Sequence, residues 1–107
     1  MEENADSLSL RNPIMEAMIH ETNEKLQRCS DAPIADACLL ACIQTINHFK
    51  IAAYGTAFAY ASAMQLTKAA SIFREAEINE KQIDDRLSQL AEHEINERAR
   101  TSMLLPV

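Results

Sequence analysis

Apolar residues recur every three or four positions along most of the chain, in segments separated by short stretches of turn-forming residues. This spacing places them on one side of a helix and predicts an all-α protein. The first helix is expected over residues 13–29, where Asn12 can cap and Pro13 suits the first helical position. The stretch Ser30-Asp31-Ala32-Pro33 predicts a turn and a second helix start, and the second helix continues to about Met64.

The third predicted helix begins with Thr67 as its cap and fades near Arg100. A heptad spacing puts Glu80 inside its apolar stripe, and a carboxylate in that place needs a partner because an unpaired buried charge is costly. The stripe contains Phe73, Glu80 and Leu87, with Ala76, Ile83 and Leu90 beside them. We therefore expect one helical domain over residues 12–100, a flexible polar segment over 1–11 and an apolar tail over 101–107.

The second helix is apolar on nearly every side, which is typical of a helix buried by several neighbours. Two seams are predicted on it, one of Leu39, Ile46, Ala53 and Tyr60 and one of Cys42, Phe49 and Thr56. The second and third helices would be about 45–50 Å long and the first only about 25 Å. The first helix cannot cover both long ones, so we expect a homodimer in which two hairpins complete a four-helix bundle.

Composition narrows the function classes. The 107 residues carry a formal net charge of −6, which argues against a nucleic-acid partner because phosphate binding needs a cationic surface. No charge-free apolar run reaches the ~18 residues that span a bilayer, and the start lacks the features of a signal peptide. The three cysteines form no Cys-x-x-Cys pair and are typical of reduced thiols, so a cytoplasmic location is expected.

The only glycine, Gly55, lies among alanines and indicates a close helix contact. The residues predicted to serve packing or an interface are Gly55, Ala52, Phe49, Tyr60, Phe73 and Leu87.

The segment 47–55, Asn-His-Phe-Lys-Ile-Ala-Ala-Tyr-Gly, resembles the Glu-His-Tyr-Glu-Ile-Ala-x-Tyr-Gly signature of the YciE/YciF group of bacterial ferritin-like proteins. Residues 15–19 and 33–37 resemble two upstream elements of that group, and Asn79-Glu80 with Asp84 and Leu87 resembles a downstream one. The resemblance covers roughly residues 13 to 100. It implies a ferritin-like helical bundle, an association with stress, and a di-iron-type carboxylate centre.

This chain departs from the group at the centre. Asn47 and Lys50 stand where the group has glutamates, and Asn79 replaces one of a glutamate pair. Hard cations need several anionic oxygens, so we expect a degenerate site without a cofactor. Lys50 is predicted to pair with Glu80 or Glu77 in place of a metal. A solvated Lys50 on the helix flank is an equally weighted alternative.

The resulting interpretation is a non-enzymatic structural or stress-associated assembly protein. The alternative is a di-iron-type protein that binds iron or manganese, with the site completed across a homodimer. Its residual ligands would be Glu80, Asp84, His48 and Glu77. The group also has two helices ahead of this region, and a partner protein could supply them.

Overall fold

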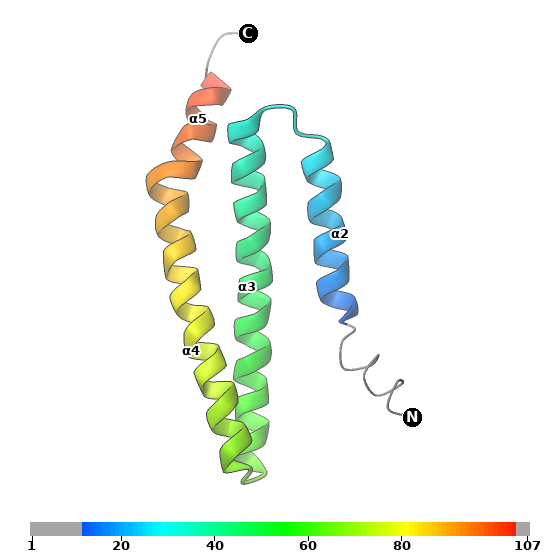
Figure 1. Cartoon of the computed structure of the whole chain (residues 1–107), viewed down its shortest axis with the longest axis vertical. Helices are drawn as coiled ribbons and strands as arrows, with labels where there is room; N and C mark the ends of the chain where they lie inside the picture. The colour runs from blue at the N-terminus through cyan, green and yellow to red at the C-terminus, as the bar shows by residue number, and fades with distance from the viewer. Residues whose placement is uncertain (1–11, 105–107) are drawn as a thin grey trace.

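The computed structural model describes residues 12–104, and within this range every element is helical. The prediction of an all-α chain is confirmed, while the predictions for residues 1–11 and 105–107 lie outside the described range. Three helical rods lie side by side in one layer (Figure 1), and the molecule measures 60 × 31 × 15 Å. The third dimension is about the thickness of one helix with its side chains. None of the helices in this part of the chain is long and apolar enough to cross a membrane.

The first rod is α2, Pro13–Gln27. It starts where the sequence predicts, because the Asn12 side chain accepts a hydrogen bond from the Met15 backbone N–H at 3.1 Å. It ends two residues before the expected Cys29.

The central rod is α3, Ala32–Ala63, which lies between α2 and α4. Asp31 caps it by accepting the Ile34 backbone N–H at 3.2 Å. The second carboxylate oxygen of Asp31 accepts a hydrogen bond from the Ser102 hydroxyl. One side chain therefore both starts α3 and holds the far end of the chain beside it.

A tight reversal at Gln65 connects α3 to the next helix. Gln65 has φ 59°, and the N–H groups of Gln65 and Leu66 donate to the carbonyls of Ser62 and Ala61. This is the Schellman arrangement, in which a left-handed residue ends a helix and satisfies its last carbonyls.

The third rod begins with α4, Thr67–Leu90. The prediction that Thr67 is the cap was wrong: Leu66 occupies the cap position without a side-chain bond, and Thr67 is the first helical residue. The rod continues through a π-helical turn η1, Ala91–Ile95, into α5, Asn96–Leu104. Its end lies four residues beyond the expected Arg100, so the first part of the predicted tail is helical. The wide turn keeps Ala91 and Ala99 buried on the side that faces α3.

The core of the single chain is thin. The buried hydrophobic residues lie mainly between α3 and the third rod, and among the described residues no side chain is fully enclosed. Several large apolar side chains remain open to solvent in the isolated chain. A stable domain normally packs two layers around one core, and this chain provides one. The buried hydrophobic residues are Leu40, Ala61, Ala70, Ala91 and Ala99.

Candidate functional site

Glu80 forms the centre of a polar network between α3 and α4. Its side chain is 12% exposed, and Lys50 Nζ lies 2.7 Å from Glu80 Oε1. Asn47 Nδ2 donates to Glu80 Oε2 at 2.7 Å and to the Glu80 backbone carbonyl at 3.1 Å. Both oxygens of the carboxylate therefore have partners. The Lys50 side chain is 38% exposed, so its ammonium reaches solvent while it neutralises the buried acid.

Asn47 is the residue whose role sequence reasoning missed. It is buried, and it ties α3 to both the side chain and the backbone of Glu80. Its Oδ1 is buried without a hydrogen-bond partner. The buried residues of α3 are Leu40, Asn47 and Ala61. The sequence signal for the burial of Asn47 is its spacing, because it lies seven residues after Leu40 and fourteen before Ala61.

His48 lies on another side of α3. Its Nε2 is 2.8 Å from Asp84 Oδ1, and the His48 side chain is 63% exposed. Residues two apart on an α-helix point about 200° from each other. The structure therefore places His48 and Lys50 on opposite sides of the hairpin, each with its own carboxylate.

Glu77 forms a third pair. Its Oε2 lies 3.3 Å from Lys81 Nζ, one turn along α4. The same carboxylate covers Gly55, where an added Cβ would lie 3.1 Å from Glu77 Oε2. The sole glycine therefore makes room for a glutamate side chain from α4.

The four candidate metal ligands are distributed over these three pairs. Among residues 12–104, no group of three or more His, Cys, Asp or Glu side chains could hold a metal ion. Glu80 presents a single carboxylate whose two oxygens already bind Lys50 and Asn47. An ammonium at 2.7 Å from that carboxylate also repels a second cation. The residues present do not fit the carboxylate centre that the resemblance implies.

The predicted packing residues fall into two groups. Phe49, Phe73, Leu87 and Gly55 are half-buried, whereas Ala52 is exposed and Tyr60 is 68% exposed in the single chain. Of the seam predicted through Leu39, Ile46, Ala53 and Tyr60, only Ile46 is partly buried. That seam does not face α4, because the buried positions of α3 are Leu40, Asn47 and Ala61.

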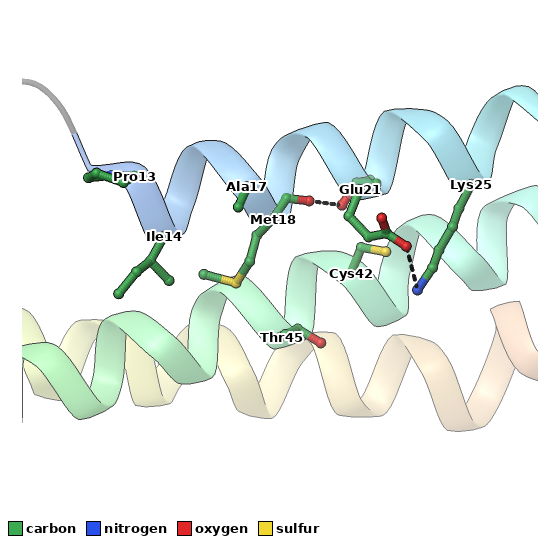
Figure 2. A pocket seen from close by; sticks show the side chains of 9 residues that line it. Pro13, Ile14, Ala17, Met18, Glu21, Lys25, Cys42 and Thr45 are labelled. Carbon is green, nitrogen blue, oxygen red and sulfur yellow. Dashed lines mark hydrogen bonds and ion pairs between the residues drawn. The ribbon is translucent and has the colours of Figure 1, made fainter.

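A groove of about 490 Å³ runs between α2 and α3, away from the Glu80 network. Figure 2 shows Met18 of α2 and Cys42 of α3 reaching into it from its two sides, with the Glu21–Lys25 pair at one end. The Lys25 Nζ to Glu21 Oε1 distance is 3.8 Å. The groove contains no converging polar groups that would indicate a reaction.

The three cysteines are free and half-buried. Partial burial raises the pKa of the Cys29 thiol, and the neighbouring Cys38 thiol raises it further by hydrogen bonding and charge. A raised pKa disfavours the thiolate, which is the reactive form of cysteine.

Comparison with known proteins gives the family. Residues 2–100 match the family described as Domain of unknown function (DUF892). The chain is also 35% identical over 85 residues to Protein YciF of Escherichia coli (strain K12). These 85 residues make up 79% of this chain and 51% of YciF. The chain thus spans about half the length of this curated relative, and no solved structure matches it. The chain belongs to the DUF892 family and is of the YciF type.

Proposed function

We propose that this protein is a non-enzymatic, ferritin-like assembly protein in which an ion pair replaces the metal centre of its group. Lys50 is the residue that carries this proposal. It stands where the group has a glutamate, and its ammonium lies 2.7 Å from the one buried carboxylate of the site. The positive charge that links α3 to α4 is thus the ammonium group of Lys50, in place of a bound metal ion.

The surroundings of Glu80 support a structural role. Asn47 also takes the place of a glutamate, and its amide donates to Glu80 instead of adding a negative charge. A lysine and an amide together neutralise and bind the acid, so the carboxylate does not need a bound ion as its partner. Each oxygen of the buried Glu80 carboxylate already has a partner, which supports a structural role for this side chain.

Homodimerisation is part of the proposal. The single chain forms one layer with exposed apolar side chains, and a partner would cover them. The net charge of −6 and the three free cysteines support a cytoplasmic location. The association with stress rests on the resemblance to the YciE/YciF group.

The di-iron alternative has less support. A second copy could bring another Glu80 near the first, but each carboxylate would first have to release Lys50 and Asn47. His48 could not join that cluster, because it binds Asp84 on the other side of α3.

The test combines elemental analysis with two variants. The purified protein should contain no stoichiometric iron, manganese or zinc. Lys50→Glu with Asn47→Glu should raise the affinity for added manganese, since two carboxylates then face Glu80, and should lower thermal stability without metal.

Lys81→Glu is the matched control. Lys81 also pairs with a glutamate of α4, but it is 60% exposed, so the same charge reversal should leave manganese affinity unchanged. Stoichiometric metal in the unmodified protein that is lost in Glu80→Ala would overturn the proposal and favour the di-iron alternative.

A further inference from the structure

The layer has two open sides, and they differ in chemistry. Asn47 of α3 bonds Glu80 of α4, and Leu40 and Ala61 are buried on the same side of α3. α3 faces α2 on its opposite side through Cys42 and Thr45. The two remaining sides of the hairpin are open, and we name each after the α3 residue on it: the His48 side and the Lys50 side. The His48 side carries the His48–Asp84 and Glu77–Lys81 pairs and the Gln44–Ser88 hydrogen bond.

Apart from Lys50 itself, the Lys50 side of α3 carries apolar residues from Leu39 to the C-cap residue Met64. Positions three, four or seven residues from Lys50 share its side of the helix. The span from residue 39 to residue 64 is about 38 Å long. Its large members are exposed in the single chain except Ile46, which is partly buried: Leu39, Ile43, Ile46, Tyr60 and Met64.

α4 continues the same surface. Its residues on the Lys50 side of Glu80 repeat at the same interval of three or four positions, and from residue 72 to residue 90 they span about 27 Å. Asn79 lies at the middle of this stripe, and Arg86 lies on its outer edge, where a long side chain reaches water. The large apolar members are Ile72, Ile83 and Leu90, all exposed in the single chain.

We infer that the Lys50 side of the α3–α4 hairpin is the surface on which a second copy of this chain docks. This rests on the homodimer proposed above and identifies its interface. The stripes on α3 and α4 are about 38 Å and about 27 Å long, and each is about 10 Å wide. Together they present a footprint of roughly 600 Å² per copy, which reaches the lower range of stable interfaces. The repeat interval of 3.5 residues is the one that packs helices into a bundle.

The polar residues decide how the two copies are oriented. Lys50 and Asn79 occupy the middle of their stripes, at the height of Glu80. If α3 lay over the α3 of the second copy, two Lys50 ammonium groups would face each other. If α3 lies over α4 of the second copy, each Lys50 faces the partner's Asn79, whose side-chain carbonyl accepts a hydrogen bond. The second arrangement is the one we propose.

A matched pair of variants tests the surface. Ile83 and Ile78 lie on the same helix and are 44% and 46% exposed, but only Ile83 lies on the Lys50 side. Sedimentation equilibrium should show a dimer for the unmodified chain and for Ile78→Glu, and at least a hundredfold weaker association for Ile83→Glu. The thermal midpoint of the unmodified chain should also rise with protein concentration. A monomer whose midpoint is independent of concentration, or equal effects of both variants, would overturn the proposal.

Asn79→Asp tests the orientation by the sign of its effect. With α3 over the partner's α4, the new carboxylate faces a lysine, and the dissociation constant should fall about three- to tenfold at low salt. With α4 over α4, two new carboxylates would meet, and the constant should rise. Asn23→Asp on α2 makes the same change away from the surface and should leave it unchanged. Metal content is measured separately, so the ion-pair proposal and the interface can fail independently.

Discussion

His48 and Lys50 are separated by one residue in the chain, yet they bind carboxylates on opposite sides of the α3–α4 hairpin. His48 Nε2 lies 2.8 Å from Asp84, and Lys50 Nζ lies 2.7 Å from Glu80. Their carboxylate partners are one turn apart on α4, so both pairs join the same two helices. Residues 48–50 therefore link α3 to α4 on both sides of the hairpin, through the His48–Asp84 pair on one side and the Lys50–Glu80 pair on the other.

Removing the ammonium group of the Lys50–Glu80 pair should destabilise the protein. Lys50→Met leaves Glu80 with Asn47 alone, and we expect the free energy of unfolding to fall by about 1–2 kcal/mol, a value reduced for the partial exposure of Lys50. Adding Glu80→Gln should restore part of the loss, because a neutral amide needs no cation. Urea denaturation of the two single variants and the double variant gives the coupling directly. Additive losses would show that the two side chains act independently.

Gly55→Ala should stabilise α3. Alanine is favoured over glycine in a helix by about 0.5–1 kcal/mol, and the new Cβ would meet only the Glu77 carboxylate at 3.1 Å. That carboxylate is the end of a flexible side chain, so it can move by a few tenths of an ångström. We expect a net gain of about 0.5 kcal/mol in urea denaturation. The gain should be larger in a Glu77→Ala background, and a loss there would point to a backbone contact at Gly55.

Gln65→Gly should also stabilise the protein. Gln65 has φ 59°, a left-handed conformation that costs a residue with a Cβ about 1 kcal/mol and costs glycine little. The expected gain is about 0.5–1 kcal/mol, seen as a rise in the thermal midpoint. Ser62→Gly, three residues earlier in α3, should lower stability by a similar amount because Ser62 is helical. A destabilising Gln65→Gly would mean that the glutamine side chain makes a contact that offsets its strain.

Cys29 should react at a higher pH than an ordinary cysteine. Partial burial and the adjacent Cys38 thiol raise its pKa, so its thiolate forms only as the pH rises further above the usual range. Cys38→Ser should shift the pH profile of Cys29 alkylation by iodoacetamide to lower pH, read by peptide mass spectrometry. Cys42→Ser, a change of the same kind one turn further along α3, should leave the profile in place. Equal shifts in both variants would contradict the role of Cys38.

Local signals made much of the fold predictable. Asn12 and Asp31 are capping residues beside prolines, and the starts of α2 and α3 follow from the hydrogen bonds they accept. The position of Glu80 inside an apolar stripe of α4 was equally readable, because Phe73 and Leu87 lie seven residues before and after it and are both half-buried.

The rotation of α3 was not predictable from its own residues. Apolar side chains cover nearly every side of it, so several seams satisfy the helical period equally well. The seam chosen from the sequence, through Leu39 and Tyr60, lies on the open Lys50 side, whereas the contact with α4 runs through Asn47. A buried asparagine resembles a surface residue until its partner on the other helix is known. The π-helical turn at Ala91–Ile95 was missed for a similar reason, since packing against α3 determines it.

The single-layer arrangement has a consequence for the order of folding. Within residues 12–104, α2 contacts α3 and neither α4 nor α5, so the long hairpin loses none of its own contacts when α2 is absent. Helices adjacent in the chain pair through short loops, which favours rapid hairpin formation. We therefore expect α2 to attach and detach as a separate unit, and its backbone amides to exchange with deuterium well before those around Glu80.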